Sequence, residues 1–178
     1  SIDETEPRVG KFRELLAPKM RRRTALTAIP WFLMDIGLYG IGLFTPILLA
    51  GIFVSGGSSG SFLKSDFEAT ASSAFTDVFL VVGFAINILL VEKVGRIHLQ
   101  VVGFVGMTVG LVVVALSSDG SVVPLVLIGF VLFNTFVNAG PNATTYLLPA
   151  EVYPTRLRGT GHGFAAACGK FGAAVGTL

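Results

Sequence analysis

The feature that most constrains this chain is a long apolar run over residues 24–53 that contains a single carboxylate, Asp35. A helix of this length, at about 1.5 Å per residue, can cross a hydrocarbon layer of roughly 30 Å with some tilt. An ionised group at the centre of a bilayer costs at least roughly 2.5 kcal/mol, so such groups face a protein interior or a cavity. We therefore expect a spanning helix whose one charge, Asp35, has a function.

Aromatic side chains accompany this carboxylate on one face of the predicted helix. Trp31, Asp35 and Tyr39 follow one another at intervals of four residues, which stacks them along a single helix face. Pro30 and Pro46 each remove a backbone donor and favour kinks in the same helix. The predicted helix therefore presents a bent face that is both aromatic and acidic.

The composition indicates that the rest of the chain is also membrane-embedded. Hydrophobic residues make up 52% of it and charged residues only 13%, whereas a soluble domain carries about 25% charged residues. Four further apolar segments follow the first, at about residues 70–91, 98–116, 121–148 and 160–178. We expect an all-α membrane protein, in which residues 1–23 form a juxtamembrane linker and residues 24–178 a bundle of about five spans. Because the last segment has no closing loop or flanking charge, the chain looks like a piece of a longer protein.

The basic residues are sorted by loop. Eleven of the thirteen Lys and Arg residues lie in residues 1–23 or in the loops after the second and fourth predicted spans. The positive-inside rule makes that side cytoplasmic, so we predict a multi-pass cell-membrane protein with a cytoplasmic N-terminal segment. The run Arg21, Arg22 and Arg23 is best explained as a topological anchor against the lipid bilayer, beside anionic headgroups, rather than as a nucleic-acid site.

Three polar residues lie at similar predicted depths in the membrane. Counted from the cytoplasmic ends of their helices, Asp35, Asn142 and Lys170 lie roughly 16, 10 and 15 Å deep at about 1.5 Å per residue. They can therefore share one cavity near the midplane. The alternative for Asp35 and Lys170 is a buried ion pair that only joins two helices, but apolar replacements of such pairs are often as stable. We favour a functional role for both.

Side-chain amides form a stripe on the fourth predicted span. Asn134, Asn138 and Asn142 follow at intervals of four residues, and Gly140 with Pro141 breaks the helix just before the last of them. We expect Asn134 and Asn138 to make interhelical hydrogen bonds, worth on the order of 0.6 to 2 kcal/mol each. Asn142 lies beside the break, where backbone carbonyls are freed, and is predicted to contact a ligand.

Sequence motifs of enzymes and cofactor sites are not found in the chain. It has no nucleophile elbow, Gly-rich phosphate loop, HExxH or paired-Cys motif. His98 and His162 have no ligand-like neighbours in the sequence. We therefore predict no enzyme activity, no metal site and no cofactor.

Several segments resemble those of a known superfamily. EKVGR (residues 92–96) and EVYPTRLRG (residues 151–159) are similar to cytoplasmic signatures of the major facilitator superfamily. WFLMDIGLYG, GPNATTYLLPAEVYPTRLRGTGHG and AAACGKFGAA together resemble its phosphate:proton symporter branch, and the resemblance covers residues 24–178. It implies that these spans are the seventh to eleventh of twelve, and that an N-terminal half of the same transporter precedes them. The glutamine pair that sugar porters carry in the seventh helix is absent.

The resemblance also implies roles for individual residues. Trp31, Asp35, Tyr39 and Asn142 match positions that line the bound phosphate. Lys170 matches a lysine that is tied to substrate charge or proton coupling. An ionised Asp35 would repel an anion, so we expect its protonation to admit the anion and to couple the two flows.

We therefore expect a proton-coupled secondary active transporter of a small anion, most simply inorganic phosphate, that works by alternating access. Charged loop residues are predicted to latch the cytoplasmic ends of the helices in the outward-facing state: Glu92 with Arg96, and Glu151 with Arg156 and Arg158. Topology anchoring alone is the alternative role for these residues. A carrier of sugars or other organic solutes, and a non-transporting membrane sensor with the same fold, stay open as alternative functions.

Overall fold

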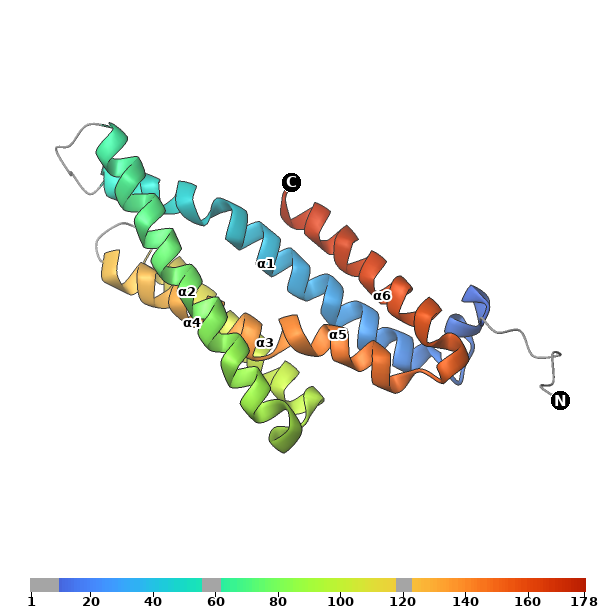
Figure 1. The fold of residues 1–178 in the computed structure, drawn as a ribbon. Helices are drawn as coiled ribbons and strands as arrows, with labels where there is room; N and C mark the ends of the chain where they lie inside the picture. The colour runs from blue at the N-terminus through green and yellow to red at the C-terminus, as the bar shows by residue number, and fades with distance from the viewer. Residues whose placement is uncertain (1–9, 56–61, 118–122) are drawn as a thin grey trace, which may run out of the picture.

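The chain is a bundle of helices in the computed structural model, which describes residues 10–55, 62–117 and 123–178 and has no strand within them (Figure 1). A short 3-10 helix, η1 (Phe12–Leu16), comes first. The α-helices that follow are α1 (Arg21–Ser55), α2 (Phe62–Val94), α3 (Arg96–Leu116), α4 (Val123–Ala139), α5 (Pro141–Val152) and α6 (Thr155–Gly176). The predicted all-α class is confirmed.

Four helical stretches of the described residues are long and apolar enough to cross a membrane. They are Arg21–Ile47, Phe67–Val94, Arg96–Leu116 and Pro124–Val152, and they correspond to the first four predicted spans. Helix α6 is not among them, because glycines and polar side chains lower its hydropathy. The fifth span, residues 160–178, stays a prediction.

The fourth of these stretches is broken where the sequence places Gly140 and Pro141. Gly140 adopts φ −128° and ψ −98°, outside the helical range, and Pro141 then starts α5 as its first residue. Helix α4 therefore ends at Ala139, whose carbonyl accepts a hydrogen bond of 2.7 Å from the Asn87 side chain on α2. A side chain of a neighbouring helix thus binds the backbone at the break.

Helices α1 and α6 lie side by side along much of their length (Figure 1). Their approach depends on Gly169, Gly172 and Gly176, which recur on one face of α6. A Cβ atom added at Gly172 would lie 2.2 Å from the carbonyl oxygen of Phe32, and one added at Gly176 would lie 2.5 Å from that of Ile36. Small residues at such positions let two membrane helices approach closely enough for their backbones to touch.

Helix α4 lies between α2 and α3 and is tied to α2 by amides. The Asn134 side chain donates to the Thr76 carbonyl (3.0 Å) and to the Asp77 carboxylate (3.2 Å), and Asn138 donates to the Leu80 carbonyl (2.9 Å). Both asparagines are more than 90% buried. The prediction that Asn134 and Asn138 make interhelical hydrogen bonds is confirmed.

The described part of the linker is bound to the first turns of α6. The Gly10 amide donates to the Arg156 carbonyl (2.8 Å), and the Thr160 hydroxyl donates to the Gly10 carbonyl (3.0 Å). Leu15 of η1 is fully buried in a cluster with Tyr153 and Leu157. Residues 10–20 therefore belong to the packed structure, and residues 1–9 of the predicted linker lie outside the described residues.

Candidate functional site

Asp35 lies in the interior of the bundle, on α1. Only 2% of its surface is exposed, and its Oδ2 atom has no hydrogen-bond partner among the described residues. A buried polar group that lacks a partner is costly, and a buried charge more so. The fold therefore buries Asp35 in a position where its Oδ2 atom gains no stabilising hydrogen bond from the described residues.

Lys170 approaches this carboxylate from α6. Its Nζ atom donates to the Tyr39 hydroxyl at 3.2 Å and lies 5.1 Å from the centre of the Tyr39 ring. The charge of Lys170 also acts on Asp35, although the two side chains do not form a direct ion pair. The α1–α6 contact thus brings together three of the predicted site residues, Asp35, Tyr39 and Lys170.

Trp31, one turn before Asp35, belongs to an aromatic cluster. Its ring centroid lies 4.5 Å from that of Tyr146 on α5 and 5.4 Å from that of His162 on α6. Trp31 is 99% buried and packs against Gly169, where an added Cβ would lie 2.3 Å from the indole Cδ1. The cluster joins the three helices that surround the candidate site.

Sequence reasoning missed Tyr146 and His162, although each had a signal. Tyr146 follows Asn142 by four residues, so it shares the Asn142 face of α5. His162 precedes Lys170 by eight residues and shares the Lys170 face of α6. The contact of Tyr146 and His162 with the Trp31 ring is what connects them to the site.

Asn142 lines a groove between α2 and α5 whose volume is about 720 Å³. Its side chain donates to the Asn138 side chain. Tyr146, Asn87 and Glu92 line the same groove and make part of its wall polar. The described residues show no hydrogen bond between Asn142 and either Asp35 or Lys170, so their common cavity stays a prediction; Tyr146 connects the groove to Trp31.

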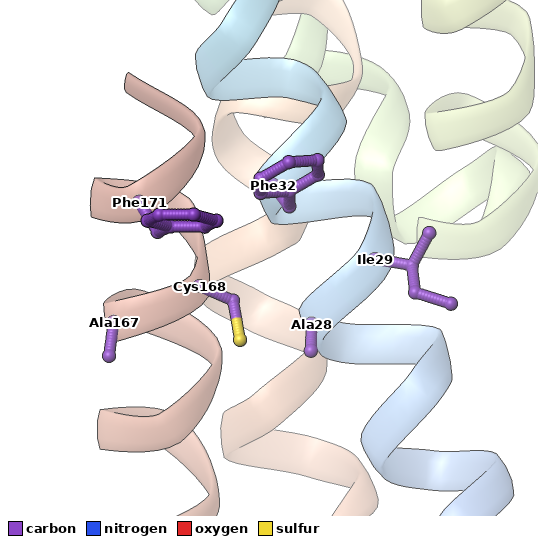
Figure 2. Close-up of a pocket in the computed structure, with 6 residues that line it drawn as sticks. All are labelled: Ala28, Ile29, Phe32, Ala167, Cys168 and Phe171. Atoms are coloured by element: carbon purple, nitrogen blue, oxygen red, sulfur yellow. The ribbon is translucent and has the colours of Figure 1, made fainter. Parts of the chain in front are cut away.

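A second groove, between α1 and α6, differs in character. Figure 2 shows its lining, which is made of Ala28, Ile29, Phe32, Ala167, Cys168 and Phe171. Its volume is about 390 Å³. Since none of these side chains carries a charge or a strong hydrogen-bonding group, this groove has no means to bind an anion.

The charged loop residues form ion pairs, but not all of those predicted. Arg96 binds Glu92 (Nη2 to Oε1, 2.7 Å) and Glu151 (Nε to Oε1, 3.0 Å), which ties α2, α3 and α5 together at one end of the bundle. In this structure Glu151 pairs with Arg96 and Arg156 with Glu14, so the predicted pairing of Glu151 with Arg156 and Arg158 in the outward-facing state stays a prediction. Helix α5 ends at Val152, just after Glu151, and the chain turns before α6 begins at Thr155, so the following arginines lie on another side.

Arg156 and Arg158 have different surroundings. Arg156 pairs with Glu14 of η1. Arg158 is exposed and makes no ion pair within the described ranges.

The family model described as "Sugar (and other) transporter" matches residues 22–178. The chain belongs to this transporter family. This places it in the major facilitator superfamily and confirms the resemblance that the loop motifs indicated. With four helical stretches able to cross a membrane, it is part of a multi-pass membrane protein.

The curated relatives that this chain resembles carry the names of phosphate transporters. It is 35% identical over 170 residues to "Repressible high-affinity phosphate permease" of Neurospora crassa, covering 93% of this chain and 29% of the relative. It is 35% identical over 177 residues to "Probable inorganic phosphate transporter 1-12" of Oryza sativa subsp. japonica, covering 95% and 32%. It is 34% identical over 193 residues to "Low affinity inorganic phosphate transporter 1" of Petunia hybrida, covering 98% and 36%. The chain thus spans about a third of the length of these relatives.

Proposed function

We propose that the protein containing this chain is a proton-coupled secondary active transporter of a small anion, most simply inorganic phosphate. The observation that carries the proposal is the buried Asp35 carboxylate, which has a free oxygen and lies within the electrostatic reach of Lys170. The names of the relatives support phosphate as the solute. The protein is accordingly a carrier and not an enzyme.

The side chains around Asp35 suit an oxyanion. The Lys170 ammonium supplies a positive charge and the Tyr39 hydroxyl a hydrogen-bond donor, and in this proposal the Asn142 amide, which lines the groove between α2 and α5, supplies a second donor. The Trp31 indole N–H is a further donor, which lies on the α6 side of its ring, near Gly169. Binding of the anion by these groups would replace part of the hydration that it loses on entering the bundle.

The coupling to protons follows from the sign of the charges. An ionised Asp35 repels an incoming anion, whereas a protonated Asp35 is neutral and donates a hydrogen bond. In the empty carrier Lys170 compensates the Asp35 carboxylate; in the loaded carrier the proton does so, and Lys170 is then available to the anion. Proton and anion therefore enter and leave together.

Alternating access would follow from rocking of this bundle against the other half of the transporter. In this proposal the basic loops are cytoplasmic, as the positive-inside rule requires. The Arg96 ion pairs with Glu92 and Glu151, and the Arg156 pair with Glu14, then hold the cytoplasmic ends together and must rearrange when the carrier opens on that side. Arg158 would belong to the same cytoplasmic latch, or it would only anchor the topology of its loop.

Uptake into proteoliposomes tests the coupling. Asp35→Asn keeps the size and polarity of the side chain but cannot exchange a proton, so we expect loss of phosphate accumulation driven by a pH gradient. Asp77→Asn is the matched control, because Asp77 is an exposed carboxylate on α2; it should keep accumulation. Accumulation at the wild-type level in Asp35→Asn would overturn the proposed role of Asp35.

Two alternative functions are separated by simple assays. A carrier of sugars or other organic solutes would take up those solutes in competition with phosphate, whereas a phosphate carrier should be inhibited by phosphate analogues such as arsenate and not by hexoses. A non-transporting sensor would bind phosphate without exchanging it. Counterflow of labelled phosphate into vesicles loaded with unlabelled phosphate distinguishes it from a carrier.

A further inference from the structure

Helix α1 begins with Arg21, Arg22 and Arg23 and has no acidic residue in its first turn. This is the reverse of the usual preference, because the N-terminus of a helix carries a partial positive charge that favours acidic side chains and anions. Lys19 lies just before the helix. The start of α1 is therefore a concentration of positive charge for which the helix itself offers no compensation.

The rest of the bundle compensates this charge only in part. Arg23 donates to the Val152 carbonyl through Nη1 at 2.8 Å, which fixes its side chain against the end of α5. Arg21 and Arg22 are exposed, and neither has an acidic partner within the described ranges. Two of the three guanidinium groups are thus available to a ligand outside the bundle.

A groove lies beside these arginines, between the start of α1 and the end of α5. It has a volume of about 530 Å³ and is lined by Arg23, Leu26, Glu151, Val152, Tyr153 and Pro154. Glu151 is its one acidic residue, and Arg96 already pairs with that carboxylate at 3.0 Å. The groove therefore keeps the positive character of the arginines beside it.

An apolar track leads away from this basic end along α1. Arg22, Leu26, Ile29 and Leu33 follow at spacings of four, three and four residues, which places them on one helix face. Leu26, Ile29 and Leu33 are 36%, 56% and 50% exposed. A basic end that continues into an exposed apolar stripe is complementary to an amphiphile that has an anionic head and hydrocarbon tails.

We propose that this surface binds an anionic phospholipid. The phosphate and the further anionic group of the lipid lie against the exposed Arg22 and in the adjacent groove that Arg23 lines, and an acyl chain lies along Leu26, Ile29 and Leu33. A zwitterionic lipid such as phosphatidylcholine binds less well, because it lacks the second anionic group and carries no net negative charge for the arginines to attract. The binding does not depend on the transported solute or on Asp35, so it stands or falls separately from the proposed function.

Native mass spectrometry of the full-length protein in detergent tests the lipid site. We expect the wild type to retain phosphatidylserine in preference to phosphatidylcholine. Arg22→Gln removes one exposed charge and should weaken phosphatidylserine retention by about fivefold, the contribution of one basic residue near an anionic surface. Lys93→Gln, which removes an exposed basic residue from the last turn of α2, is the matched control and should leave retention within about twofold of the wild type.

Two further measurements decide whether a lipid, and not another ligand, is the occupant. Leu33→Ser should weaken retention of both lipids, because it interrupts the apolar track; no effect would mean that another part of the protein covers this face, and would overturn the proposal. Displacement of phosphatidylserine by millimolar inorganic phosphate would identify a site for free phosphate instead. Equal retention of the two lipids by the wild type, or equal losses in Arg22→Gln and Lys93→Gln, would also overturn it. Far-UV circular dichroism and gel filtration check that each variant is folded.

Discussion

Two helix contacts of this bundle carry polar side chains in different ways. In the α2–α4 contact, the amides of Asn134 and Asn138 donate to backbone carbonyls of the facing helix. In the α1–α6 contact, the Asp35 carboxylate is as deeply buried, but one of its oxygens has no partner in the part of the chain that the structure describes. Buried groups with partners add stability, whereas a buried group without one has a cost that selection for stability would remove. The comparison therefore favours a structural role for α2–α4 and supports the binding role proposed for α1–α6.

The largest effect is expected where the α1–α6 contact is closest. Gly172→Leu should abolish folding or lower the free energy of unfolding by about 3 kcal/mol or more, because its Cβ would lie 2.2 Å from a backbone oxygen of α1 that cannot move alone. Thermal unfolding of the purified protein in detergent measures it. Gly163→Leu is the control, since a Cβ there meets no atom within 4 Å; equal destabilisation by both would show that the contact is not as close as described.

The next largest effect is expected on transport and not on stability. Lys170→Met keeps the length of the side chain and removes its charge, and the side chain is exposed. The Tm should therefore change little, while phosphate uptake should fall roughly 10- to 100-fold, the usual worth of a hydrogen bond to a charged group. Tyr39→Phe, which removes only the hydroxyl that accepts from Lys170, should lower uptake by less. Uptake at the wild-type level in Lys170→Met would show that α6 does not contribute to the binding site.

The opposite pattern is expected in the α2–α4 contact. Asn134→Ala removes a donor to the Thr76 carbonyl and should lower the free energy of unfolding by on the order of 1 kcal/mol. Uptake per folded molecule should stay within about twofold of the wild type, because the remaining groups of this contact have partners. If Asn134→Ala lost uptake as Lys170→Met does while keeping its stability, the distinction between the two contacts would fail.

The sequence was sufficient for much of the fold because a membrane restricts what a chain can form. The first four spans follow from the length of the apolar runs, and the break at Gly140 follows from Gly-Pro chemistry. Asp35 and Lys170 stand out for the same reason, since a charge within an apolar segment needs an explanation. These features are local, so no knowledge of packing is needed to find them.

Features that depend on how helices face one another could not be predicted in this way. Tyr146 and His162 are ordinary residues in the sequence and join the site only because α1, α5 and α6 meet at Trp31. Glu151 was assigned the nearest arginines in the chain, yet it pairs with Arg96 on α3. The partner of a charge at a helix end is set by the rotation of that helix and by the turn after it, which periodicity does not specify.

The smallest effect on stability is expected at this last ion pair. Glu151→Gln leaves Arg96 paired with Glu92, and exposed pairs contribute little, so the Tm should fall by about 2 °C or less. If the pair also latches the ends proposed to be cytoplasmic, the variant should open to that side more readily, and the labelling of a single cysteine introduced into a loop on that side should rise. Glu14→Gln, which releases Arg156 from η1, gives the matched comparison for the second pair. A variant with unchanged Tm and unchanged accessibility would reduce Glu151 to a topological role, and would leave the Arg156–Glu14 pair as the remaining candidate for the proposed latch.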